Sequence, residues 1–120
     1  MNYVDGFVIP VPKKKLPAYL RMAKTASKVW RDHGALEFRE SVADDVKVGK
    51  RTSFPRSVKL KPGETVVFAW IVYKSRAHRD RVNAKVMKDA RMAKMMTGGE
   101  KMPFDAKRMI FGGFKVLYAA

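Results

Sequence analysis

Residues 65–73 form an almost unbroken apolar run, TVVFAWIVY, and this run limits the folds open to the chain. Successive side chains of a strand point to opposite faces of a sheet, so a strand with one wet face alternates apolar and polar residues. This run does not alternate. One face would carry Val66, Phe68, Trp70 and Val72, and the other Val67, Ala69, Ile71 and Tyr73. Both faces need cover. Two evident helices are expected to cover one face, and a second copy of the protein is the simplest cover for the other.

The composition is that of one globular domain over residues 1–120. Hydrophobic residues make up 47% of the chain, but no stretch approaches the ~20 apolar residues of a membrane-spanning helix. The chain contains no cysteine, which excludes disulfides and thiolate metal sites. Its first residues lack the basic and apolar regions of a signal peptide. We therefore expect a cytoplasmic protein without a membrane segment.

The first part of the chain is expected to place a helix between two strands. Residues 3–11 are strand-like, and Pro10 and Pro12 are expected to end the ladder because proline donates no backbone hydrogen bond. Residues 13–32 have the apolar spacing of an amphipathic helix, whose regular part begins near Lys15 or Leu16. Gly34 then ends this helix, and residues 35–42 alternate as a half-exposed strand.

The second part repeats the pattern after a long connection. Residues 43–62 are polar, and a loop of this length is uncommon unless it is functional or folded into a hairpin arm. After the apolar strand, Ser75 is a suitable N-cap for a second helix that runs to about Lys88. Residues 89–92 either continue this helix or form a separate turn. Residues 108–118 are expected to be the last strand, interrupted by Gly112 and Gly113.

The resulting order, βαββαβ, predicts a ferredoxin-like α+β fold. In this arrangement a four-stranded antiparallel sheet carries both helices on one face. The first and third strands are then central, which agrees with a third strand that is apolar throughout. Two such sheets packed face to face would bury the remaining apolar face and form a dimeric α+β barrel with two-fold symmetry.

Seven short segments, spread over essentially the whole chain, resemble one protein family. They are residues 3–8 (YVDGFV), 34–36 (GAL), 44–46 (DDV), 63–68 (GETVVF), 102–105 (MPFD), 107–109 (KRM) and 112–114 (GGF). In these segments the chain resembles the YbaA-like family, which consists of small bacterial proteins of unknown function. The resemblance implies a dimeric α+β barrel and supplies no established catalytic residues. At Ala90 the family more often has proline, which leaves the end of the second helix open.

Two carboxylates lie on strand faces that are otherwise apolar, those of Asp5 and Glu40. An unpaired carboxylate is costly to bury, and Arg108 at the start of the last strand is a candidate counter-ion for either. A buried carboxylate with a raised pKa suits proton transfer, whereas a paired structural carboxylate or a solvated strand end explains the same pattern. If the chain is an enzyme, these residues would carry metal-free proton-transfer or oxygenation chemistry, but the sequence leaves that question open. Monooxygenases, haem-degrading enzymes and lactone isomerases of the wider superfamily offer fold analogy alone.

A small-molecule pocket is the second candidate feature. Its expected lining, between the first helix and the sheet, is Tyr19, Trp30, Phe68 and Trp70. Core packing of these aromatic residues is the alternative. The methionines late in the chain are interpreted as adaptable packing of the core or an interface. His33 and His78 lack the spacing of a metal site, and no phosphate-binding loop is present, so we expect neither a metal nor a cofactor.

The charge of the chain suggests an alternative role in nucleic-acid binding. Lys and Arg number 26 against 11 Asp and Glu, which gives a formal charge of +15. Such a field attracts polyanions whether or not this is the protein's role. The candidate surface is the basic face of the second helix, with Arg76, Arg79, Arg81, Lys85 and Lys88. No aromatic residue interrupts these basic residues to stack on bases, so we expect non-specific rather than sequence-specific attraction.

Overall fold

A computed structural model describes residues 2–97 and 102–120 of the chain. Its four strands are β1 (Tyr3–Pro12), β2 (Glu37–Val42), β3 (Glu64–Tyr73) and β4 (Ile110–Lys115). They form one sheet in the order β2-β3-β1-β4, in which all neighbouring strands are antiparallel. The predicted α+β class with a four-stranded antiparallel sheet is confirmed. The strand β3, which is apolar throughout, lies at a central position between β2 and β1.

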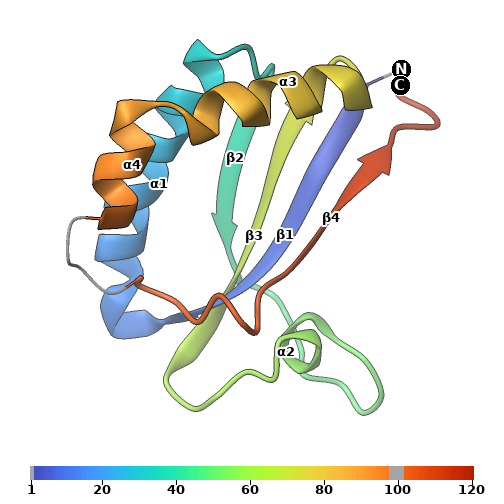
Figure 1. The fold of residues 1–120 in the computed structure, drawn as a ribbon. Coiled ribbons are helices and arrows are strands. Elements are labelled where there is room, and N and C mark those ends of the chain that lie inside the picture. The colour runs from blue at the N-terminus through green and yellow to red at the C-terminus, as the bar shows by residue number, and fades with distance from the viewer. Residues whose placement is uncertain (1, 98–101) are drawn as a thin grey trace.

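Helices cover one face of this sheet (Figure 1). A short 3-10 turn at Lys13–Lys15 leads into α1 (Leu16–Asp32), and α3 (Arg76–Met87) is followed by α4 (Ala90–Thr97). The side chain of Ser75 accepts a hydrogen bond from the amide of His78, which confirms the expected N-cap of α3. Ala90 begins the separate helix α4, which resolves the alternative left open for residues 89–92. None of the helices in the described residues is long and apolar enough to cross a membrane.

Two strand predictions are wrong. Pairing of β1 with β3 continues through Pro10 and Pro12, opposite Val66 and Glu64. Because β4 pairs with β1 only as far as Val8, the later part of β1 has a free edge, where prolines are tolerated. Gly112 and Gly113 do not interrupt the last strand but lie inside β4, opposite Gly6 and Asp5 of β1. The last strand is also shorter than expected, since β4 is confined to Ile110–Lys115.

The core lies between the helices and the sheet, in two clusters that share Phe7 at their boundary. One cluster packs α3 and α4 against the ends of the strands, with Val29, Ile71, Tyr73, Val82 and Val86 at its centre. The other packs α1 against the middle of the sheet, around Ile9, Val11, Tyr19, Ala23 and Val67. Each central strand therefore contributes every second residue to this layer.

The opposite face of the sheet is covered at one end only. The connection between β2 and β3 contains the short helix α2 (Phe54–Ser57), and it folds back so that Val58 packs on Val8 and Val66. Thus the long polar connection packs on the sheet as an arm built around a short helix, and it is not a hairpin. Phe68, whose ring contacts Phe54 of α2, remains 43% exposed, and beyond the arm Ile110 and Phe114 remain 44% and 63% exposed. The face predicted to lack cover within one chain is therefore largely uncovered.

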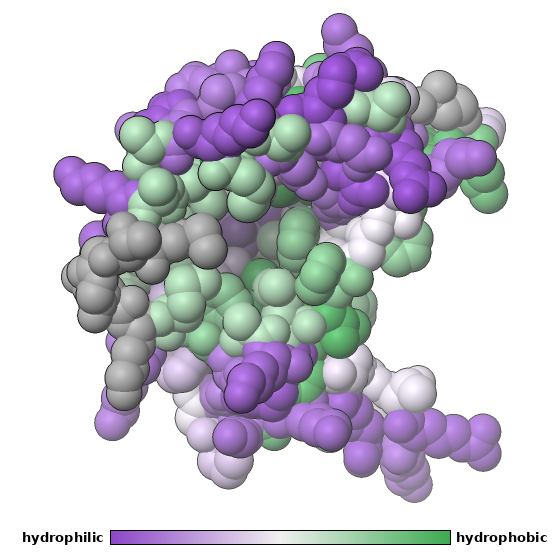
Figure 2. Space-filling model, viewed as in Figure 1, coloured by the Kyte–Doolittle hydropathy of each residue, from purple (hydrophilic) through white to green (hydrophobic). Residues whose placement is uncertain are grey.

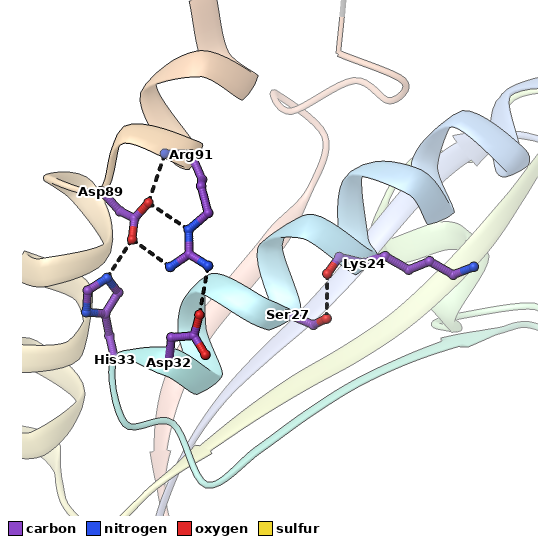
Figure 3. Close-up of polar contacts among 6 residues, drawn as sticks. All are labelled: Lys24, Ser27, Asp32, His33, Asp89 and Arg91. Atoms are coloured by element: carbon purple, nitrogen blue, oxygen red, sulfur yellow. Dashed lines mark hydrogen bonds and ion pairs between the residues drawn. The ribbon is translucent and has the colours of Figure 1, made fainter.

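A polar cluster joins the end of α1 to the start of α4 (Figure 3). Nε2 of His33 lies 2.7 Å from Oδ2 of Asp89, and Nη1 of Arg91 lies 2.7 Å from Oδ2 of Asp32. Arg91 also binds Asp89 through Nη2, at 2.8 Å. These contacts connect the start of α4 to the end of α1.

Candidate functional site

The site with the clearest capacity to hold a ligand is a cavity of about 300 Å³ between α1, α4 and the sheet. Its floor is apolar and comes from β1 and β3, where Phe7, Ile9, Ala69 and Ile71 point toward the helices. Trp30 of α1 and Phe38 of β2 form a further wall, with their ring centroids 6.0 Å apart. Figure 2 shows apolar side chains around a recess in the middle of the molecule, between hydrophilic surfaces along α3 and along the α2 segment.

Methionines form much of the remaining wall. Six of the eight methionines of the chain line the cavity, namely Met22, Met87, Met92, Met95, Met102 and Met109. They converge from α1, from the end of α3, from α4 and from the segment before β4. Met87 and Met102 are 61% and 45% exposed, so the cavity reaches the molecular surface at these two side chains. Unbranched thioether side chains change shape at little cost, which gives the wall an adaptable surface.

Two charged residues, Arg39 and Glu40, interrupt this apolar lining. Glu40 of β2 points to the helix side, where its Oε2 accepts a hydrogen bond of 2.7 Å from the hydroxyl of Tyr19 on α1. Burial raises the pKa of the Glu40 carboxyl, and the hydrogen bond from Tyr19 offsets part of the rise. Burial, together with the nearby Glu40, also raises the pKa of the Tyr19 hydroxyl. Both residues border a second, smaller cavity of about 90 Å³ beside Leu16 and Val67.

Arg108 does not serve as the counter-ion of Asp5 or Glu40, which corrects the expected arrangement. Its Nη2 lies 2.6 Å from Oε2 of Glu64, and its Nε lies 3.0 Å from Oδ2 of Asp105. The register explains the difference. Asp5 pairs with Gly113, near the end of β4, whereas Arg108 precedes β4 at the opposite end of the sheet, close to the start of β3.

Asp5 instead pairs with Arg79 of α3, a residue predicted for the nucleic-acid surface. Nη1 of Arg79 lies 2.6 Å from Oδ1 of Asp5, and the two side chains are 19% and 10% exposed. Burial raises the pKa of the Asp5 carboxyl, and the charge of Arg79 opposes the rise. The three candidate catalytic residues thus sit in separate polar contacts. No candidate pair among Asp5, Glu40 and Arg108 is brought together.

The predicted aromatic lining is divided between the two faces of the sheet. Tyr19 and Trp30 line the cavity, whereas Phe68 and Trp70 lie on the opposite face, beside Phe114 and Gly6. Alternation along β3 causes this split, since Ala69 and Ile71 occupy the helix side. The expectation of one pocket lined by all four aromatic residues is therefore wrong.

The basic face of α3 keeps most of its predicted members. Arg76, Arg81, Lys85 and Lys88 are exposed, while Arg79 turns inward to Asp5. Binding of nucleic acid by this face stays a prediction. In the part of the chain that the structure describes, no three His, Asp or Glu side chains are grouped closely enough to hold a metal ion.

Comparisons with known proteins place the chain among relatives without an assigned activity. The model of a family described as "Protein of unknown function (DUF1428)" matches residues 2–106. The chain is 50% identical over 115 residues to "Uncharacterized protein YbaA" of Escherichia coli K12, with 96% of each chain covered. The protein of the same name in Shigella flexneri is equally similar, at 50% identity over 96% of each chain. Among solved structures, a de novo designed protein named Foldit4 aligns with a TM-score of 0.46 and 11% identity, over 97% of this chain and 99% of that one.

Proposed function

The chain belongs to the DUF1428 family, whose function is unknown, and from its own geometry we propose that it binds an apolar small molecule. The observation that carries this proposal is the methionine-lined cavity between α1, α4 and the sheet. A volume of about 300 Å³ lies at the lower end of the range of ligand pockets. It equals the liquid volume of about ten water molecules at ~30 Å³ each, which is enough for a short alkyl chain or up to three aromatic rings.

A cavity of this kind gains binding energy by removing apolar ligand surface from water. Burial of apolar area contributes about 25 cal/mol per Å², and the lining offers almost no competing polar groups. The exposed Met87 and Met102 provide an entry that can open by side-chain rotation alone. The ion-paired cluster of Asp32, His33, Asp89 and Arg91 holds α4 at a fixed distance from α1, which keeps the cavity from collapsing.

We further propose that two copies pair through the uncovered sheet face to form a ferredoxin-like dimeric barrel. The strand order β2-β3-β1-β4 with the helices on one face supports the ferredoxin-like arrangement. Contiguous exposed apolar side chains on a sheet indicate an interaction surface, and this face presents Phe68, Ile110 and Phe114. Because each copy carries a charge of +15, repulsion opposes pairing, so salt should strengthen the dimer.

Ligand binding is tested with N-phenyl-1-naphthylamine, an uncharged apolar dye that fluoresces more strongly out of water. We expect saturable binding at one site per chain. Replacing the half-buried Met95 with tryptophan should fill the cavity and weaken dye binding at least tenfold. The matched control is Lys94→Trp, which adds the same ring to the exposed side of α4. Ala26→Leu is a milder filling variant, to be used if Met95→Trp fails to fold. Equal dye binding by all folded variants would refute the cavity as the site.

Pairing is tested by light scattering coupled to size-exclusion chromatography. The wild type should elute with twice the mass of the 13.7 kDa chain, and more completely at high salt. Phe114→Asp places a charge in the proposed interface and should yield a monomer with intact secondary structure. An exposed residue on the helix side, Lys24→Asp, serves as the charge control. A wild type that stays monomeric at all salt concentrations would exclude the dimer.

A further inference from the structure

We infer that the cavity selects ligands that carry a protonated amine on an apolar body, and that Glu40 is the residue that selects them. This inference rests on the proposed function, because it specifies the chemistry of the ligand that the same cavity would take. The geometry that supports it is the placement of one carboxylate, with a free oxygen, in a largely apolar wall whose other charged residue, Arg39, is paired with Glu37.

The first step concerns the free oxygen of Glu40. Its Oε2 accepts from Tyr19, and within residues 2–97 and 102–120 neither a hydrogen bond nor an ion pair is made to Oε1. The same described residues contain no enclosed side-chain nitrogen or oxygen that lacks a partner. Oε1 is therefore not sealed inside the protein but is accessible, and Glu40 borders both the methionine-lined cavity and the smaller cavity of about 90 Å³. A carboxylate oxygen in that position accepts a hydrogen bond from whatever occupies the cavity.

Among the described residues, no cation balances the charge of the Glu40 carboxylate. Seven other acidic residues form ion pairs with arginine, namely Asp5, Asp32, Glu37, Glu64, Asp80, Asp89 and Asp105. Glu40 is half-buried and has no cationic partner among the described residues, although the chain contains 26 Lys and Arg. Its neighbour Arg39 also borders the cavity, but the Nε of Arg39 lies 3.0 Å from Oε1 of Glu37.

The third step is the consequence for ligands. Burial of a carboxylate without a counter-ion disfavours its charged form, which is the cause of the raised pKa of Glu40. A protonated amine in the cavity supplies the missing positive charge and donates to Oε1 at once. Charge-assisted hydrogen bonds are roughly twice as strong as neutral ones. An alcohol of the same length would make only the weaker bond, and a carboxylate would place two like charges together.

The test uses three probes with one alkyl chain length and different heads: decylamine, decanol and decanoate. Each displaces N-phenyl-1-naphthylamine from the wild type, from Glu40→Gln and from Glu37→Gln, below the concentration at which the probe aggregates. In the wild type we expect decylamine to bind about tenfold more tightly than decanol, with decanoate the weakest. Glu40→Gln should lose most of this preference and leave decanol binding within about threefold. Glu37→Gln changes the same residue type on the same strand, on the opposite face, and should keep the wild-type order.

The outcomes separate this inference from the proposed function. If no probe displaces the dye, or the dye does not bind, the cavity does not take apolar ligands and both proposals fail. If all three probes bind with equal affinity, or decanoate binds best, the cavity function stands and the role of Glu40 is overturned. Retention of the full amine preference by Glu40→Gln also overturns it. Should that variant not fold, the order of the three probes on the wild type still decides.

Discussion

Nη1 of Arg79 lies 2.6 Å from Oδ1 of Asp5, so an ion pair joins helix α3 to the central strand of the sheet. The guanidinium carbon of Arg79 also lies 5.0 Å from the centre of the Tyr3 ring, and its Nε binds Asp80 at 2.8 Å. Arg79, which the sequence suggested for a nucleic-acid surface, thus holds α3 against the sheet. Its partner is the carboxylate of Asp5, which the sequence suggested for catalysis.

The contributions of Asp5 and Arg79 to the free energy of unfolding should be coupled. Asp5→Asn leaves Arg79 without its buried partner, and we expect the free energy of unfolding to fall by roughly 1.5–3 kcal/mol. The double variant with Arg79→Met should lose clearly less than the sum of the two single losses, because neither partner is then left alone. Urea denaturation of the four proteins measures both effects. Asp80→Asn is the control, since its side chain is 60% exposed and its loss should stay within about 0.5 kcal/mol. Additive losses would show that the pair is not coupled.

The ring of Tyr3 lies against Gly113, so a side chain at this position should destabilise the protein. A Cβ atom at Gly113 would come 2.7 Å from Cε2 and Cζ of Tyr3. Gly113→Ala should therefore displace this ring from Arg79 and cost roughly 1–3 kcal/mol of stability. At the adjacent Gly112 a Cβ atom would meet Cε1 of Phe114 at an ordinary 3.7 Å, so Gly112→Ala should stay within about 0.5 kcal/mol of the wild type. Equal unfolding temperatures for the two variants would contradict this reading.

The fold could be predicted from periodicity because its strands and helices bury complete faces. Residues 65–73 required a central strand with two apolar faces, and Ser75 fixed the start of α3. The wrong strand predictions concern features that the spacing of apolar residues does not determine. Prolines are permitted in β1 because β4 ends at Val8, and that fact depends on a pairing between distant segments.

The candidate site was less predictable for a related reason. The identity of ion-pair partners depends on strand register, and Arg108 and Asp5 lie at opposite ends of the sheet. Arg79 lies in the first turn of a helix that leaves β3 beside Tyr3, so the register of β1 with β3 was the signal that could have identified it. The split of Phe68 from Trp30 followed from alternation alone and was available from the sequence. The sequence alone could not show that methionines from four segments converge on one cavity.

Titration of Glu40 should make the folded protein less stable as the pH rises. Burial raises the pKa of this carboxyl in the folded protein above its ordinary value of 4.5. Between the ordinary and the raised pKa, the folded chain holds a proton that the unfolded chain has lost, so stability falls as pH rises through this window. Glu40→Gln does not titrate. The stability of this variant relative to the wild type should therefore increase from pH 4.5 upward and level off above the folded pKa, as measured by urea denaturation at a series of pH values. A relative stability that does not change with pH would contradict the raised pKa.

Oxidation of methionine should abolish ligand binding before it unfolds the protein. Met87 and Met102, at the mouth of the cavity, are 61% and 45% exposed, whereas Met92 is only 7% exposed. Dilute peroxide should therefore convert the two exposed side chains to polar sulfoxides first, which mass spectrometry of proteolytic fragments detects. A polar group at the mouth opposes entry of an apolar molecule, and N-phenyl-1-naphthylamine affinity should fall severalfold while circular dichroism stays unchanged.

The double variant Met87→Leu with Met102→Leu keeps the mouth of the cavity apolar and removes the two exposed sulfur atoms there. It should bind the dye as the wild type does and retain this affinity after the same peroxide treatment. Loss of binding in the variant at the same rate would place the sensitive methionines deeper, among Met22, Met92, Met95 and Met109. In that case unfolding should accompany the loss, because Met92 belongs to the buried cluster that packs α3 and α4 on the sheet. The order of the two events, loss of binding and loss of structure, thus tells whether ligands enter past Met87 and Met102.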